Sequence, residues 1–191
     1  MIAIVDYGVG NLFSLVSSLK ALGLEAEVTG GAGRLRAADR IILPGVGAFG
    51  DARQKLDDTG LVPVLLEEAE KKPLLGICLG MQLLFDRSFE YGEHPGLGLV
   101  PGQVVDLRRD LTDPTLKVPH MGWNSLRILK DDPLFRYVRD GEYVYYVHSF
   151  YARDCTESTL ATSQYGNVAV TGVVRRGNVC LLYTSDAADE E

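Results

Sequence analysis

A single cysteine stands between two glycines where two apolar segments meet. Residues 76–80 read Gly-Ile-Cys-Leu-Gly, after Pro-Leu-Leu at 73–75 and before Met-Gln-Leu-Leu-Phe at 81–85. A sharp turn from a strand into a helix strains the backbone of its central residue and leaves no room for neighbouring Cβ atoms. The two glycines satisfy that requirement. The pattern therefore predicts a strand ending at residue 77 and a helix beginning directly after Cys78.

This position makes Cys78 a candidate nucleophile. Such a turn lifts the sulfur above the edge of the sheet and onto a helix N-terminus, where the backbone dipoles favour thiolate over thiol. A buried structural cysteine is the usual explanation for a lone cysteine. The bracketing glycines, the preceding strand and the following apolar helix favour the catalytic interpretation here.

Short apolar runs alternate with helical patterns in the first half of the chain. The predicted strands are 2–5, 24–28, 40–43 and 74–77, and the predicted helices are 12–22 and 61–72. Such alternation predicts an α/β fold with a parallel sheet covered on both faces. Ligands bind at the carboxyl ends of such strands, which is where Cys78 falls.

The second half of the sequence has a different pattern of predicted elements. Strand-like segments follow one another at 104–107, 126–129, 142–150, 160–164 and 168–174, with one short helix expected at 132–138. We expect an antiparallel extension of the same sheet, because no linker rich in Ser, Gly or Pro separates the halves. The polar stretches 51–60 and 86–96 are expected to be surface loops or short helices.

Composition and charge exclude several classes of protein. The 191 residues suit one domain, and the net charge of −7 argues against binding to nucleic acid. Three separated cysteines without a Cys-x-x-Cys pair indicate neither a zinc site nor a disulfide framework. The first residues already read as a strand, and there is no long apolar span. We therefore expect a soluble, cytoplasmic protein with no metal and no contact with a membrane.

A second glycine-rich segment follows the third predicted strand. Residues 44–50 read Pro-Gly-Val-Gly-Ala-Phe-Gly, so the backbone can approach a ligand and expose its amides. A cysteine acyl-transfer enzyme needs such donors for the negative oxygen of its tetrahedral intermediate. Gly45, Val46 and Gly47 are candidates, and the amide of Leu79 is another. An ordinary turn is the alternative for this segment taken alone.

Three further motifs are less specific. Residues 6–11 resemble the opening of a dinucleotide fingerprint, but Phe13 stands where a third glycine belongs, so a plain turn is favoured. His148 lies in an aromatic strand, where a hydrogen-bonded core role is the more common one. Trp123 is placed on a loop at 119–124, either as an interface anchor or tucked inward.

Taken together, these segments resemble the class I glutamine amidotransferases. More narrowly, the chain is similar to the glutaminase subunits of imidazole glycerol phosphate synthases, a family of histidine biosynthesis. The match spans residues 1 to about 179 and rests on five stretches: 6–11, 44–49, 76–82, 119–124 and 146–150. The resemblance implies a flavodoxin-like mixed sheet flanked by helices.

The resemblance also implies the chemistry and the partner. Cys78 would attack the side-chain amide of glutamine, form a glutamyl thioester and release ammonia. Gln82 and the backbones of Ser149 and Phe150 would hold the glutamine, and the 45–47 loop would supply oxyanion amides. No cofactor is needed. Ammonia would pass to a cyclase subunit with a (β/α)8 barrel, whose binding would activate the glutaminase. The residues implied near that partner are Asn11, Trp123 and Tyr145.

The resemblance stops near residue 179. The family supplies the base from a His-Pro-Glu motif after a late strand, and none of the three histidines here, His94, His120 and His148, has that context. Residues 180–191 can be read as an in-frame translation of a sequencing-library adaptor. We therefore expect an amidotransferase domain at 1–179 and a non-native tail at 180–191. A natural acidic terminus is the alternative.

The absence of the histidine and glutamate of that motif has a chemical consequence. A nucleophile without its base loses several orders of magnitude in rate, because the members of a triad act as a unit. We expect a protein of these 191 residues to be poorly stable and nearly inactive. Two other interpretations stay open: a non-catalytic regulatory or scaffold relative, and a different cysteine hydrolase on the same fold that uses His148 as its base.

Overall fold

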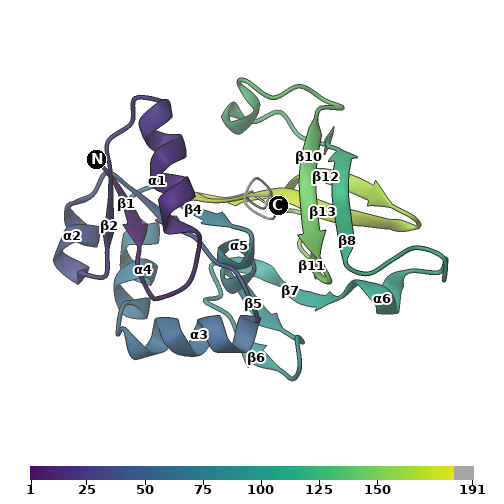
Figure 1. The fold of residues 1–191 in the computed structure, drawn as a ribbon, viewed down its shortest axis with the longest axis horizontal. Coiled ribbons are helices and arrows are strands. Elements are labelled where there is room, and N and C mark those ends of the chain that lie inside the picture. The colour runs from purple at the N-terminus through teal and green to yellow at the C-terminus, as the bar shows by residue number, and fades with distance from the viewer. Residues whose placement is uncertain (183–191) are drawn as a thin grey trace.

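The computed structural model describes residues 1–182, and its largest element is a mixed sheet of eight strands (Figure 1). The order across the sheet is β2-β1-β3-β4-β14-β13-β12-β9. The first five strands run parallel, and the last three continue the sheet antiparallel. The strands are β1 (Ile2–Val5), β2 (Ala26–Thr29), β3 (Arg40–Leu43), β4 (Leu74–Ile77), β9 (Arg127–Ile128), β12 (Thr159–Tyr165), β13 (Val168–Arg176) and β14 (Val179–Leu182).

Helices cover both faces of the parallel part, which confirms the predicted α/β class. Alternation along β1 explains the two layers: Ile2 and Ile4 pack with Leu19 of α1, whereas Ala3 and Val5 face the larger core with α2, α3 and α4. The helices are α1 (Leu12–Ala21), α2 (Ala32–Ala37), α3 (Phe49–Asp58), α4 (Val62–Ala69), α5 (Leu79–Leu83), α6 (Leu107–Asp110) and the 3₁₀ turn η1 (Pro133–Phe135).

Residues 85–153 form two more sheets that the sequence did not predict. A two-stranded ribbon joins β8 (His120–Ser125) to β10 (Tyr143–His148). A four-stranded sheet has the order β11-β7-β5-β6, with β5 (Phe85–Ser88), β6 (His94–Pro95), β7 (Val100–Asp106) and β11 (Phe150–Arg153). The antiparallel extension is therefore right for β9, β12 and β13 only.

Two local predictions were wrong. Residues 119–124, expected as a loop, lie almost entirely in strand β8, and the stretch 86–96, expected as surface loop or short helix, contains most of β5 and the whole of β6. These strands are defined by backbone pairing with β10 and β7, and such pairing with distant segments left no sequence pattern that the prediction could use. The stretch 51–60 lies largely in helix α3, within the expected range of outcomes.

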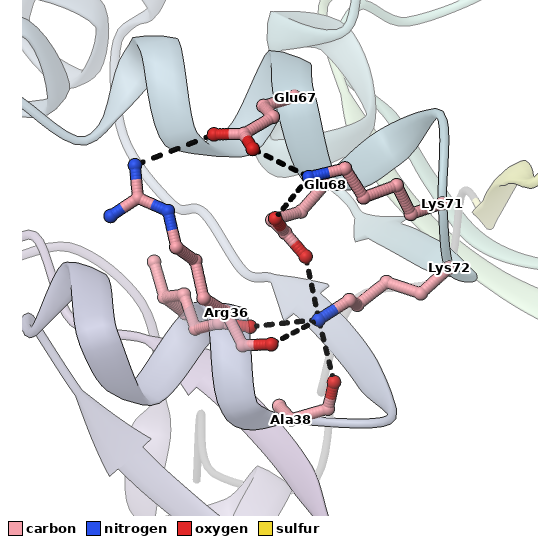
Figure 2. A network of polar contacts seen from close by, with 7 residues as sticks. Arg36, Ala38, Glu67, Glu68, Lys71 and Lys72 are labelled. Atoms are coloured by element: carbon pink, nitrogen blue, oxygen red, sulfur yellow. Dashed lines mark hydrogen bonds and ion pairs between the residues drawn. The ribbon is translucent and has the colours of Figure 1, made fainter.

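A network of charges ties α4 to the end of α2 (Figure 2). The ammonium of Lys72 donates to the carbonyls of Arg36 and Ala38, both at 2.7 Å, and pairs with the buried carboxylate of Glu68 at 2.6 Å. Lys71 approaches the same carboxylate from the solvent side at 3.1 Å. Lys72 therefore satisfies the last carbonyls of α2 and a buried charge at once.

We expect Lys72→Met to lower the free energy of unfolding by about 3 kcal/mol, because it leaves the Glu68 carboxylate and three carbonyls at the end of α2 without this cation. Lys71→Met is the matched control and should have a small effect, because its ammonium is half exposed. Urea denaturation of the two variants measures the difference. Equal effects would contradict the role of Lys72.

The loss of stability caused by Lys72→Met should also depend on pH. The hydrogen bond from Lys72 lowers the pKa of Glu68, so the pair contributes stability above the unfolded pKa of about 4.3. That contribution is lost as the pH falls through the lower folded pKa. The difference between the Lys72→Met variant and the unsubstituted chain should therefore shrink in acid.

Candidate active site

Strand β4 delivers Cys78 to the N-terminus of α5 through the strained turn that the glycine pattern predicts. Cys78 has a φ of 54° and a ψ of −116°, a left-handed backbone that non-glycine residues rarely adopt. Its side chain is partly exposed, unlike that of the buried Cys155. The elbow thus presents the sulfur at the carboxyl edge of the parallel sheet, between β3 and β14.

Gly80, two residues after Cys78, and Gly45 are required by close backbone packing. A Cβ atom on Gly80 would lie 1.9 Å from the carbonyl oxygen of Leu43, at the end of β3. A Cβ on Gly45 would lie 2.6 Å from the amide nitrogen of Gly80. The first turn of α5 is therefore pressed directly against the start of the glycine-rich loop.

This packing places the candidate oxyanion loop beside the nucleophile. The amide of Leu79 donates a hydrogen bond to the carbonyl of Gly45 at 3.3 Å. Behind the loop, the buried hydroxyl of Tyr7 donates to the carbonyl of Pro44 at 2.6 Å. Burial raises the pKa of the Tyr7 hydroxyl, and its electrostatic interaction with Cys78 raises that pKa further. Val46 is half exposed beside them.

The predicted glutamine-binding residues meet at a corner of the chain. β10 ends at His148 and β11 begins at Phe150, so Ser149 joins the ribbon to the four-stranded sheet. The carboxamide of the buried Gln82, on α5, donates to the carbonyl of Phe150 at 3.4 Å. The structure therefore brings the elbow helix against the corner, although the two are about 70 residues apart in sequence.

Two histidines lie together on the ribbon. Nδ1 of His120 is 3.0 Å from Nε2 of His148, and Nδ1 of His148 is 3.0 Å from the Phe150 carbonyl. Burial lowers the pKa of His120 to about 4, and burial together with the neighbouring His120 lowers that of His148 to about 3. An engaged imidazole with so low a pKa is poorly suited to act as a general base near neutral pH. This arrangement argues against His148 as the base of a different hydrolase.

The sequence did not indicate that the loop between β5 and β6 lies near the glycine-rich loop and the corner. The carboxylate of Glu90 accepts a hydrogen bond from the Phe49 amide at 2.6 Å, where the glycine-rich segment enters α3. Burial raises the pKa of Glu90. The ring of the next residue, Tyr91, lies edge-on to that of Phe150 at 6.1 Å between centroids. Tyr91 is 87% exposed and has a φ of 53°.

The residues expected at a partner surface occupy two places. Trp123 of β8 and Tyr145 of β10 are cross-strand neighbours whose rings meet edge-on at 5.6 Å, and Trp123 is 68% exposed. Asn11 caps helix α1, where its side-chain oxygen accepts from the Ser14 amide at 3.1 Å. The ribbon thus presents an aromatic face outward.

The described part of the chain holds no cluster of histidine, cysteine or carboxylate side chains suited to a metal ion. Within residues 1–182, no helix has the length and apolar character needed to cross a bilayer.

Comparison with known proteins agrees with this geometry. The family model described as "Glutamine amidotransferase class-I" matches residues 3–179, so the chain belongs to the class I glutamine amidotransferase family. It is 50% identical to the imidazole glycerol phosphate synthase subunit HisH of Lacticaseibacillus casei (strain BL23), over 94% of this chain and 84% of that relative. The HisH subunit of Wolinella succinogenes is 45% identical, over 92% of this chain and 86% of the relative.

A solved glutamine amidotransferase shares the fold, with a TM-score of 0.72 at 19% identity, covering 100% of this chain and 93% of that structure. The match confirms the mixed α/β architecture.

We expect Gly80→Ala to lower the free energy of unfolding by about 3 kcal/mol or more, because the new methyl group meets backbone that cannot move aside. The matched control is Gly33→Ala in α2, where a Cβ meets nothing within 4 Å and φ is not left-handed. That variant should gain up to about 1 kcal/mol. Thermal unfolding of both variants tests the contrast, and a tolerated Gly80→Ala would contradict the close packing.

Proposed function

We propose that the chain is the glutaminase subunit of an imidazole glycerol phosphate synthase and acts in the cytoplasm, in histidine biosynthesis. Support comes from its similarity to HisH subunits over most of the chain. The observation that carries the chemistry is the strained Cys78 elbow, which is packed against the glycine-rich loop and followed by a helix whose Gln82 bonds to Phe150 at the 149–150 corner.

The reaction follows from these groups. The Cys78 thiolate attacks the side-chain amide carbon of glutamine, and the C–N bond breaks as the nitrogen takes a proton and leaves as ammonia. Water then cleaves the thioester and releases glutamate. Gln82 and the Ser149–Phe150 backbone hold the substrate. Amides of the 45–47 loop and of Leu79 stabilise the oxyanion, which requires the Leu79 amide to exchange its bond to Gly45 for one to the substrate.

The ammonia would pass to a cyclase subunit with a (β/α)8 barrel. The outward aromatic face of the ribbon suits such a partner, because exposed tryptophan and tyrosine are favoured anchors at interfaces. Asn11, at the start of α1, is proposed to lie near the same partner. Binding of the partner would activate the glutaminase.

A polypeptide of these 191 residues is proposed to be nearly inactive. His120 and His148 are buried in the ribbon, and His94 packs against Phe49 and Gly50, so none of the three has the context of the family's His-Pro-Glu base. The tail proposed to begin at residue 180 contributes residues 180–182 to strand β14, and residues 183–191 lie outside the described residues. A cyclase-binding scaffold without chemistry is the second candidate, favoured by the missing His-x-Glu pair.

The test is covalent labelling of the intact chain with 6-diazo-5-oxo-L-norleucine, a glutamine mimic whose carbon attaches to sulfur as nitrogen leaves. Mass spectrometry should find the adduct on Cys78 and not on Cys155, whose pKa is raised by burial. Glutamine hydrolysis with the cyclase subunit of a bacterial synthase should fall at least about 10³-fold below that of a complete HisH.

Hydrolysis at the rate of a complete subunit would contradict the proposed inactivity. Cyclase binding without any modification of Cys78 would favour the scaffold.

We expect Trp123→Ala to weaken binding of that cyclase subunit by about 2 kcal/mol, or about 30-fold in dissociation constant, because it removes an exposed aromatic anchor. Tyr137→Ala is the matched control: this side chain is 85% exposed but lies outside the ribbon, and binding should not change. Calorimetric titration measures both. An equal loss in the two variants, or none in either, would place the partner surface elsewhere.

A further inference from the structure

The inner face of the β8–β10 ribbon carries a continuous chain of side-chain hydrogen bonds. It begins at Asn124 on β8, passes through His120 on the same strand, crosses to His148 on β10, and ends at the Phe150 carbonyl. The same carbonyl accepts from the carboxamide of Gln82. The hydrogen-bond chain therefore runs from Asn124 on β8 to the Phe150 carbonyl, which belongs to the proposed glutamine site.

At Asn124, this hydrogen-bond chain can run in only one donor-to-acceptor direction. The amide nitrogen of Asn124 lies 2.9 Å from the carbonyl of Gln164, and a carbonyl only accepts. That contact fixes which side-chain atom of Asn124 is the nitrogen. The same NH₂ group faces Nε2 of His120 at 3.3 Å, so Nε2 must accept and the ring proton of His120 must sit on Nδ1.

The second end requires the same polarity independently. The Phe150 carbonyl accepts, so Nδ1 of His148 carries its proton and Nε2 is the acceptor. That acceptor faces the Nδ1–H of His120 at 3.0 Å. Both imidazoles are thus neutral, in agreement with the lowered pKa of each. Every donor in the chain meets an acceptor.

The aromatic surroundings hold the His120 ring in place. It is stacked on Tyr146 at 4.7 Å and on Tyr165 at 4.0 Å between ring centroids. The hydroxyls of these tyrosines are themselves bonded, to Ser163 and to the carbonyl of Lys117. The ring has little freedom to turn, so its Nδ1–H is aimed at His148.

We propose, on the basis of the proposed function above, that His120 is a positioning residue of the glutamine site. It holds the His148 imidazole, which bonds across the corner to the Phe150 carbonyl and so fixes the shape of Ser149 and Phe150. The Ser149 carbonyl is secured separately by the amide of Leu107 at 2.9 Å. The His120–His148 pair thus connects the side chains of β8 to this corner.

The first measurement is the protonation pattern of the ring nitrogens in the intact chain, by long-range ¹H–¹⁵N correlation NMR near neutral pH. His120 and His148 should each show a protonated Nδ1 and an unprotonated Nε2. A proton on Nε2 of either ring would overturn the inference, because the chain of bonds could not then form with neutral rings.

The second measurement compares two reagents for Cys78: 6-diazo-5-oxo-L-norleucine, which needs the glutamine site, and iodoacetamide, which reports thiol reactivity alone. His120→Leu should slow the first reagent about tenfold while changing the second less than about twofold. His120→Asn, which keeps a donor near Nδ1, should recover most of the rate. Ser125→Ala, on the exposed end of the same strand, is the control and should match the unsubstituted chain.

The outcomes separate the two claims. If Cys78 of the unsubstituted chain shows no preference for the glutamine mimic, the proposed function fails and the inference fails with it. If that preference exists and folded His120→Leu keeps it, the positioning role alone is overturned. If His120→Leu does not fold, the test rests on the NMR pattern of the unsubstituted chain and on the labelling rate of His120→Asn. Loss of the preference for the glutamine mimic in His120→Asn would then overturn the positioning role, even if the NMR pattern is the expected one.

Discussion

The site depends on the contact between the first turn of α5 and the end of β3. Gly80 lies so close to the Leu43 carbonyl that no side chain fits between them, and Gly45 is also too close to the Gly80 amide to carry a side chain. Adjacent parallel strands end at the same edge of the sheet, so this contact sets both the nucleophile and the glycine-rich loop at one point. The left-handed backbone of Cys78 is the cost of bringing its sulfur there.

The rest of the site comes from a different part of the fold. The corner at Ser149 belongs to neither the main sheet nor α5, and it reaches the elbow through Gln82. The corner joins a ribbon with an aromatic outer face to a sheet that also contains β5. The Glu90–Tyr91 loop follows β5 directly. Cys78, the proposed substrate corner and the candidate partner face are therefore linked by short contacts across separate sheets.

The parts that could be predicted from sequence are those set by local backbone requirements. The glycines around Cys78 and the buried runs at β1, β3 and β4 give the elbow and the parallel sheet directly, because strain and burial leave a local signature. Strand β8 and the contacts of the Glu90–Tyr91 loop were not predicted, because each depends on interactions with distant segments. The bond from the Leu79 amide to Gly45 is likewise invisible in sequence, because it depends on the orientation of one peptide group.

The most direct test of this account is a crystal structure of the chain with Cys78 joined to the glutamine-mimicking diazoketone. The account predicts the amino-acid end of the adduct between the Gln82 carboxamide and the Ser149–Phe150 backbone, and its carbonyl oxygen toward the 45–47 loop. An adduct that points away from the corner, with Gln82 and Phe150 still bonded to each other and no contact to the ligand, would contradict it.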